Sequence, residues 1–347
     1  MAAVAKQDIR KLSLKELTDW FVKTGEKPFR ARQVYEWLWK KGAFSFEEMT
    51  NLSKDLRWYL DENFEINAVS EDVMQQSNDG TIKMRLKLHD GELIEGVIIP
   101  TPTRTTACVS SQVGCSLSCK FCATGFMDRK RNLEPDEIFD QVVIMNQKAL
   151  ENYGSNLTNI VFMGMGEPLL NYKNVLAGIE KITAPDGLNM SPRRITVSTA
   201  GIAKMIKKLA DDEVKFNLAL SLHAANDTKR NTIMAINETN NLDTLVEALN
   251  YFDEKTGNEI TFEYILFDGF NDSLRDAKEL AELCQRVRAK VNLIEYNKVE
   301  NVPFKKASSS NRDAFVEYLE KNKIIAKVRR SRGKDIDAAC GQLANKG

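Results

Sequence analysis

Histidine is scarce in this sequence, because only His89 and His223 occur among 347 residues. This scarcity excludes histidine-rich metal sites and disfavours most mechanisms that depend on an imidazole. Long apolar runs are missing as well: no segment approaches the ~18 residues of a membrane-spanning helix, and the amino-terminal segment lacks the apolar core of a signal peptide. We therefore expect a cytoplasmic protein that has no membrane partner.

A net charge is also lacking, since 49 lysines and arginines balance 49 aspartates and glutamates. The chain therefore presents no overall field that would attract a nucleic acid by itself. Basic residues do gather locally, at 129–131, 193–194, 305–306 and 329–334. Phosphate binding needs only such a patch, although solvated surface is the more common meaning of any one cluster.

Three of the six cysteines, Cys115, Cys119 and Cys122, lie within eight residues at the spacing C-x3-C-x2-C. A tight loop with this spacing directs three thiolates at one place, and thiolates select zinc, Cu(I) or iron–sulfur clusters over hard cations. A structural zinc site and an ordinary four-iron cluster each take four protein ligands, but no fourth cysteine or histidine lies nearby. An iron without a protein ligand is a place where a substrate or cofactor can bind.

This loop, with Phe121 just before its last cysteine, resembles the cluster loop of the radical S-adenosylmethionine (radical SAM) enzymes. In that superfamily the open iron of a [4Fe-4S] cluster binds the amino and carboxylate groups of S-adenosylmethionine. The alternatives are a zinc knuckle that borrows a distant ligand and three cysteines that only fill the core. In a reducing compartment, clustered thiols are more often metal-binding or catalytic than disulfide-bonded.

Residues 1–65 predict a small helical domain. Ser13 and Glu16 form a capping box, after which apolar residues recur at helical spacing. Pro28 suits the start of a second helix, and a third is expected from Ser53 to Phe64. We interpret this segment as an accessory domain, and its basic and aromatic residues give a weaker indication of RNA contact.

Residues 66–100 change to the period of a β-strand and predict a hairpin extension. Apolar and basic residues alternate from Ile82 to Leu88, and a second strand runs from Leu93 to Ile99. Glu95 falls on the apolar face of that second strand. Such a carboxylate lies either at a sheet edge or in a pocket that shifts its pKa, and the local sequence favours the edge.

Strand-like and helical segments alternate between residues 101 and 335, which predicts an α/β core with a parallel sheet. The strand-like runs lie near 106–110, 158–163, 194–198, 216–222, 259–267 and 290–295, with a further run at 324–328. Six βα units are too few for a complete eight-fold barrel. We therefore expect a partial, open (β/α)6 barrel of the TIM type, with a wide lateral opening for a large substrate.

In such folds the ligand site forms at the carboxyl ends of the strands. The first strand leads into the cysteine loop, and the second ends in a turn that contains Gly166 and Glu167. Its glycines allow the backbone to approach a ligand closely, and Glu167 can accept hydrogen bonds from an ammonium group. Later strands end in polar residues at 198–199, 221–223 and 296–297, which suit a ribose, a carboxylate and an adenine.

The remaining cysteines stand alone in the sequence. Cys340 lies between small residues in a tail formed by residues 336–347, where it is either a surface thiol or a core filler. Cys108 precedes the triplet and is not spaced to join it. Cys284 falls on the apolar stripe of a helix, and we interpret it as core.

Several segments together resemble the RlmN-type adenine-C2 methyltransferases of ribosomal and transfer RNA, one branch of the radical SAM superfamily. The likeness covers nearly the whole chain. The segments that carry it are 107–115 (ACVSSQVGC), 164–169 (GMGEPL), 195–199 (ITVST), 221–224 (SLHA) and 332–343 (RGKDIDAACGQL).

The resemblance implies a role for each matching residue. The cluster ligands are Cys115, Cys119 and Cys122. The S-adenosylmethionine site comprises Gly166, Glu167, Ser198, Ser221, Leu222, His223 and Asn297. Cys340 carries the methyl group, Cys108 resolves an RNA adduct and Glu95 is the general base, so the resemblance replaces the edge interpretation of Glu95 with the pocket interpretation.

Carbon 2 of adenine is not nucleophilic, so it cannot take a methyl cation by simple displacement. The implied route methylates Cys340 first, and a 5′-deoxyadenosyl radical from a second S-adenosylmethionine then removes a hydrogen from that methyl group. The carbon radical adds to the adenine. Glu95 then removes the C2 proton, and Cys108 closes a disulfide with Cys340 that releases the methylated RNA.

Two other functions stay open. A Cfr-type enzyme methylates carbon 8 of adenine by similar steps, and the motifs do not separate it from the carbon 2 enzymes. A non-catalytic RNA-binding protein with a structural metal predicts zinc in the purified protein and no cleavage of S-adenosylmethionine. The partners that the resemblance implies are 23S rRNA, tRNA and a one-electron donor such as flavodoxin or ferredoxin, and the expected state is a monomer.

Overall fold

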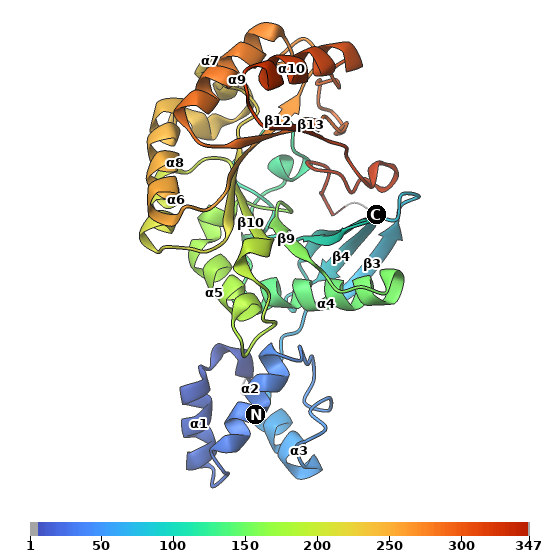
Figure 1. The fold of residues 1–347 in the computed structure, drawn as a ribbon. Coiled ribbons are helices and arrows are strands. Elements are labelled where there is room, and N and C mark those ends of the chain that lie inside the picture. Colours follow the sequence, from blue (N-terminus) through green and yellow to red (C-terminus); the bar gives the residue numbers. More distant parts are fainter. Residues whose placement is uncertain (1–5, 346–347) are drawn as a thin grey trace.

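Three helices at the amino-terminal end form a small bundle set apart from the main sheet (Figure 1). The structure, a computed structural model that describes residues 6–345, places α1 at Leu14–Lys23, α2 at Phe29–Trp39 and α3 at Lys54–Asn63. Ser13 and Glu16 complete the expected capping box before α1, and Pro28 directly precedes α2. The helices of this segment therefore begin where the sequence predicts.

The main body is built on one sheet of ten strands, in which successive strands of the core are parallel neighbours. These parallel strands are β6 (Arg104–Cys108), β9 (Asn159–Phe162), β10 (Ile195–Thr199), β11 (Asn217–Ser221), β12 (Ile260–Leu266), β13 (Lys290–Glu295) and β14 (Ala326–Arg329). Within the described residues no ladder joins β14 back to β6. The predicted partial, open barrel is confirmed, and β14 follows the six predicted βα units.

Helices cover the outer side of the parallel strands, so the central strands are buried on both faces. They are α4 (Pro135–Tyr153), α5 (Tyr172–Thr183), α6 (Ala203–Asp211), α7 (Asp227–Ile233), α8 (Leu242–Thr256), α9 (Leu274–Arg286) and α10 (Ser309–Lys321). In Figure 1, α9 and α10 lie at the opposite end of the molecule from the amino-terminal bundle. None of the described helices has the length and apolar character that crossing a membrane requires.

Three antiparallel strands extend the sheet beyond β6, namely β5 (Leu93–Thr101), β4 (Ile82–Lys87) and β3 (Ser70–Gln76). The sequence predicts β4 and β5 but misses β3, because that edge strand is polar, largely exposed and without an apolar alternation. β5 lies between β4 and β6, and Glu95 is only 1% exposed. The edge interpretation of Glu95 is therefore wrong, and the carboxylate is buried.

A buried arginine joins the amino-terminal segment to the main body. Arg10 donates hydrogen bonds to both carboxylate oxygens of Asp140 at 2.8 and 2.9 Å, and its guanidinium lies 3.2 Å from Asp136 and 3.6 Å from Asp8. Burial raises the pKa of Asp140 to about 6, whereas the positive charge of Arg10 opposes that rise. The junction is therefore a set of carboxylates that one buried cation holds together.

We expect Arg10→Met to lower the free energy of unfolding by about 3–5 kcal/mol at neutral pH, because it leaves buried carboxylates without a counter-charge. The loss should shrink as the pH falls towards 5. Without the cation, the folded-state pKa of Asp140 lies still farther above its unfolded value, so protonation favours the folded protein. Urea unfolding at two pH values measures both effects.

Lys11→Met is the matched control. Lys11 contacts the same Asp136 at 2.8 Å, but its side chain is 40% exposed. Its loss should cost less than about 1 kcal/mol, because exposed ion pairs contribute little. Equal losses for the two variants, or a loss that does not vary with pH, would contradict this account of the junction.

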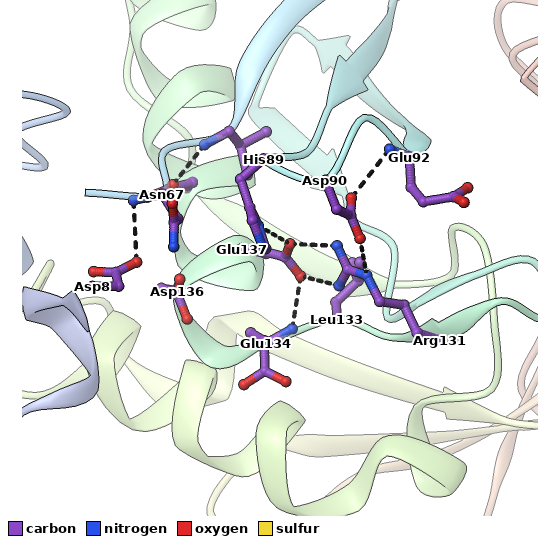
Figure 2. A network of polar contacts seen from close by, with 12 residues as sticks. Asp8, Asn67, His89, Asp90, Glu92, Arg131, Leu133, Glu134, Asp136 and Glu137 are labelled. Atoms are coloured by element: carbon purple, nitrogen blue, oxygen red, sulfur yellow. Dashed lines mark hydrogen bonds and ion pairs between the residues drawn. The ribbon is translucent and has the colours of Figure 1, made fainter. Parts of the chain in front are cut away.

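Figure 2 shows how the start of α4 is joined to the short strand that follows the cysteine loop and to the turn between β4 and β5. Arg131, in β8 (Arg131–Asn132), donates to the two oxygens of Glu137 at 2.7 and 2.8 Å and to Asp90 at 2.6 Å. Asp90 belongs to the turn between β4 and β5, and the imidazole of His89 lies 3.5 Å from Glu137. The charge of Arg131 therefore pairs with carboxylates of the protein itself, whereas solvated surface is the more common meaning of such a cluster.

Candidate active site

A cavity opens where the carboxyl ends of the parallel strands meet, as the fold predicts. Its wall comes from the cysteine loop, the turn after β9, the ends of β10 and β11, and the carboxyl-terminal tail. The predicted site residues that line it are Cys115, Cys119, Cys122, Gly166, Glu167, Ser198, Ser221, His223 and Cys340. The fold thus gathers side chains from distant parts of the sequence around one space, which we call the first cavity.

The cysteine loop is shaped by a short hairpin and a glycine. β7 (Gln112–Val113) pairs with β8, and Gly114 follows at a φ of +75°. A Cβ atom on Gly114 would lie 2.2 Å from the carbonyl oxygen of Asp128, so no other residue fits without a shift of the backbone. The N–H of Cys122 donates to the carbonyl oxygen of Cys119 at 3.2 Å, which closes the turn between the last two thiols.

The three cysteines of this loop are partly buried, and their thiols affect one another's ionisation. Burial raises the pKa of Cys115 to about 11 and also raises the pKa values of Cys119 and Cys122. The charge of Cys122 adds to the rise at both of its partners. A coordinated metal reverses this preference because it deprotonates its thiol ligands, so the loop is stabilised by a group that neutralises thiolates.

The arrangement suits a cluster better than a single ion. Among residues 6–345 no three cysteine, histidine, aspartate or glutamate side chains converge closely enough to hold one metal ion. A [4Fe-4S] cube binds each thiolate at a different iron, so its ligands lie farther apart than those of a mononuclear zinc site. Three thiols that line one cavity therefore match a cube that keeps one iron without a protein ligand.

Glu167 supplies a buried carboxylate to the first cavity and is 3% exposed. The N–H of Leu169 donates to its Oε1 at 3.0 Å, and the N–H of Ala200 donates to its Oε2 at 2.7 Å. Burial raises the pKa of Glu167 to about 7, and the hydrogen bonds from the backbone oppose that rise. Each oxygen retains a lone pair, so the carboxylate can still bind an ammonium group.

Gly166 brings its turn close to the protein's own chain. Its φ is +95°, and a Cβ atom would lie 2.5 Å from the Cβ of Gln112. The amide oxygen of Gln112 accepts the N–H of Glu167 at 2.9 Å. The sequence predicts that the glycines of this turn allow a ligand to approach the backbone. At Gly166, however, the group that approaches the backbone closely is the side chain of Gln112, and this contact positions Glu167.

His223 forms a neutral wall of the first cavity beside the hydroxyls of Ser198 and Ser221, whose oxygens lie 3.4 Å apart. Its Nδ1 accepts the N–H of Ile265 at 3.1 Å, and its ring packs edge-on against Phe121 with centroids 4.6 Å apart. Burial lowers the pKa of His223 to about 3, with a further contribution from a nearby arginine. The imidazole therefore stays uncharged at neutral pH.

Two predicted cofactor residues do not line the first cavity. Leu222 is fully buried, and its carbonyl oxygen accepts a hydrogen bond from Arg230 at 3.1 Å. Asn297 borders a neighbouring depression, and its side-chain N–H donates to the carbonyl oxygen of Cys340 at 3.5 Å. The amide oxygen of Asn297 is buried and has no hydrogen-bond partner among the described residues.

A second cavity adjoins the first, and Cys340 lines both. Cys108 contributes to its wall from the end of β6. Burial raises the pKa of Cys108 to about 12, and the charge of Cys340 adds to that rise, so the two sulfurs are within electrostatic reach of each other. Both thiols are free in this structure, and the disulfide that the resemblance implies between them stays a prediction.

Arg329 is a site residue that the sequence places only in a basic cluster. It ends β14, lines the second cavity and lies 3.8 Å from a carboxylate oxygen of Glu263. The charge of Cys340 is the main cause that raises the pKa of Arg329. The sequence does contain a signal for Arg329 and for Glu263. Arg329 directly follows the predicted strand 324–328, at the edge of the sheet where the site forms. Glu263 interrupts an apolar strand, as Glu95 does.

Glu95 lies in neither cavity lining. Its side chain is covered by the last described residues of the tail, because the N–H groups of Ala344 and Asn345 both donate to its Oε2. Of the three residues expected to carry out chemistry, Cys108 and Cys340 thus line one cavity, whereas Glu95 lies outside both linings and binds the tail.

Two family models match the sequence. The one described as "Ribosomal RNA large subunit methyltransferase N-terminal domain" matches residues 7–66, and the one described as "Radical SAM superfamily" matches residues 109–284. The second match begins just after β6 and includes the cysteine loop together with the carboxyl ends of β9 to β12.

Curated relatives are similar over almost the whole chain. A Cytophaga hutchinsonii protein named "Probable dual-specificity RNA methyltransferase RlmN" is 62% identical, over 99% of this chain and 94% of its own length. A Salinibacter ruber protein of the same name is 46% identical over 98% and 94%. The crystal structure of a radical SAM methyltransferase from Sphaerobacter thermophilus is 40% identical, with a TM-score of 0.93 over 98% of this chain and 100% of that one. The chain therefore belongs to the RlmN family of radical SAM methyltransferases, whose cofactors are a [4Fe-4S] cluster and S-adenosylmethionine.

Proposed function

We propose that this enzyme methylates carbon 2 of adenine in 23S rRNA and in tRNA. The observation that carries the proposal is the position of Cys340, which lines both the first cavity with its cysteine loop and the second cavity with Cys108. A thiol placed in this way can receive a methyl group on one side and pass it on at the other. The relatives' name, "dual-specificity RNA methyltransferase", and the matched N-terminal domain support RNA as the substrate.

Different residues of the first cavity bind the cluster and the separate groups of S-adenosylmethionine. When bound by Cys115, Cys119 and Cys122, the cluster supplies the electron that cleaves S-adenosylmethionine. The carboxylate of Glu167 binds the ammonium group of S-adenosylmethionine. The hydroxyls of Ser198 and Ser221 accept or donate to its ribose, and the neutral ring of His223 packs beside its adenine.

Cys340 carries the carbon, and Cys108 releases it. Cys340 attacks the methyl group of one S-adenosylmethionine and holds that carbon as a thioether. Before this carbon joins the RNA base, one hydrogen atom of the thioether methyl group would go to the 5′-deoxyadenosyl radical. Glu95 then takes the C2 proton, and the unpaired electron of the adduct would return to the bound cluster. Cys108 next attacks the Cys340 sulfur. The S–S bond forms as the S–C bond breaks, and the electron pair stays with the carbon, which takes a proton to complete the methyl group. A thiol reductant then restores both cysteines.

Each segment of the chain has its own role in this reaction. We propose an accessory domain at residues 1–65 and a strand extension at 66–100 that guide the RNA, a radical SAM core at 101–335 and a tail at 336–347 that carries the methyl group. The edge strands of this sheet are β14 and β3, and its open side gives a large substrate access. The electron donor is a small redox protein such as flavodoxin or ferredoxin, and the enzyme acts as a monomer.

Anaerobic reconstitution with iron and sulfide, followed by incubation with methyl-labelled S-adenosylmethionine and RNA, tests the proposal. Mass spectrometry of digested 23S rRNA fragments and tRNA should locate the label on carbon 2 of adenine. Label on carbon 8 would establish the Cfr-type alternative, and unlabelled RNA of both kinds would overturn the proposal. Membership in a family of methyltransferases already excludes the non-catalytic RNA-binding protein.

We expect Glu167→Gln to weaken the binding of S-adenosylmethionine by about 10- to 100-fold, because one charge-assisted hydrogen bond is lost. The amide keeps the shape of the side chain, so cluster content should not change. Anaerobic calorimetry measures the affinity. Glu263→Gln is the control: Glu263 lines the same cavity, but its carboxylate already lies 3.8 Å from the guanidinium of Arg329. Similar weakening in both variants would contradict the role of Glu167.

A further inference from the structure

Glu95 binds the end of the tail that carries Cys340. The N–H of Ala344 donates to Oε2 of Glu95 at 2.8 Å, and the N–H of Asn345 donates to the same oxygen at 3.1 Å. The side chain of Asn345 also donates to the carbonyl oxygen of Leu93, two residues earlier in β5, at 2.7 Å. Hydrogen bonds to an ionised acceptor are about twice as strong as neutral ones, so β5 holds this end of the tail firmly.

The cysteine loop holds the tail from the other side. The N–H of Ala123 donates to the carbonyl oxygen of Gly341 at 2.7 Å, and the hydroxyl of Thr124 donates to the carbonyl oxygen of Leu343 at 2.6 Å. Ala123 directly follows the last cysteine of the loop. The backbone of residues 341–345 is therefore hydrogen-bonded to the cysteine loop and to Glu95. Cys340 directly precedes this stretch, so its position depends on both attachments.

A buried cation accompanies Glu95. The ammonium group of Lys83, in β4, lies 3.5 Å from Oε1 of Glu95, and the two residues are 4% and 1% exposed. Oε1 accepts no hydrogen bond among the described residues. A buried ion pair is often no more stabilising than apolar residues of similar volume, so stability gives little reason for it. It places a cation next to the carboxylate that binds the tail.

We propose that Glu95 is a positioning residue for the tail: its carboxylate holds residues 344–345 so that Cys340 faces the first cavity and is methylated there. While the tail is bound, Glu95 lines neither cavity and its Oε2 is occupied. The end of the tail must therefore leave Glu95 before that carboxylate can take a proton from an RNA adduct. Glu95 serves two steps in succession, and release of the tail separates them.

The methylation step in this proposal rests on the proposed function, whereas the contacts of the tail do not. Two changes test it independently: Glu95→Ala removes the acceptor, and deletion of residues 344–347 removes the donors but leaves the Glu95–Lys83 pair intact. In cluster-loaded protein without RNA, each should raise the rate of Cys340 alkylation by iodoacetamide by at least about 10-fold. The double variant should show no further increase, because both changes break the same attachment.

A second measurement separates positioning from base catalysis. Transfer of a labelled methyl group to Cys340 in the absence of RNA needs no base for adenine, so a residue that is only a base cannot affect it. We expect Glu95→Ala and the deletion to slow that transfer by about 10-fold or more. The control is Glu92→Ala, which removes a half-buried carboxylate that precedes β5 and should leave both rates unchanged.

Alkylation at the wild-type rate in both the Glu95→Ala and the deletion variants would overturn the proposal, whatever the enzyme methylates. If alkylation accelerates but methyl transfer to Cys340 does not slow, the attachment exists without the proposed step, and the positioning role is refuted. Additive effects in the double variant would likewise show that Glu95 and residues 344–345 act separately.

Discussion

Cys340→Ala should abolish methyl transfer to RNA, with a fall of at least about 10⁴-fold, while iron and sulfide remain bound in full. The sulfur is the atom that carries the carbon, so no neighbouring group can replace it. The tail itself should stay in place, because Asn297 and the cysteine loop contact it through the carbonyl oxygens of Cys340, Gly341 and Leu343. Anaerobic assays with labelled S-adenosylmethionine and an iron–sulfide determination measure both quantities.

Cys284→Ala is the matched control for this variant. Cys284 lies in α9 on the outer layer, is also free, and lines neither cavity. It should retain full activity. Loss of the cluster from Cys340→Ala would show that Cys340 is a ligand, and methylated RNA from that variant would show that the carbon does not pass through this sulfur.

Cys108→Ala should trap the protein on its RNA. Without the second thiol, the S–C bond that joins Cys340 to the base cannot be exchanged for an S–S bond, so release of methylated RNA should fall by at least about 100-fold. The variant should fold normally, because Cys108 lies among apolar neighbours at the end of β6, is 7% exposed, and is replaced by the smaller alanine. A denaturing gel separates the covalent complex from free RNA.

Formation of the trapped complex must require Cys340, the thiol that carries the carbon. The double variant Cys108→Ala with Cys340→Ala should therefore show no covalent band, and RNase treatment of the single variant should remove the shift on the gel. Release of methylated RNA from Cys108→Ala at the wild-type rate would refute the resolving role of Cys108.

Local patterns in the sequence predict much of the fold and of the site. Apolar runs alternate with helical periods in the core, and the resulting parallel sheet places all strand ends at one edge. This is why Glu167, Ser198 and Ser221 could be assigned to one cavity with the cysteine loop, although they are far apart in the sequence. Close spacing likewise identifies Cys115–Cys122 without knowledge of any long-range contact.

Features that depend on long-range contacts were not predictable in the same way. Nothing in the local sequence of Leu93–Thr101 shows that Ala344 and Asn345 cover Glu95. Leu222 and Asn297 follow the strand-end rule, yet the backbone turns them out of the first cavity lining. Arg329 looks like one basic residue among several until the sheet places it beside both cysteines of the second cavity.

Three thiolates should hold a four-iron cluster and leave one iron open to S-adenosylmethionine. Mössbauer spectroscopy of anaerobic protein reconstituted with ⁵⁷Fe, with and without S-adenosylmethionine, measures this. We expect S-adenosylmethionine to alter the signal of a single iron, and alanine at Cys115, Cys119 or Cys122 to remove the cluster. A spectrum that does not respond to S-adenosylmethionine, or zinc in place of iron, would contradict it.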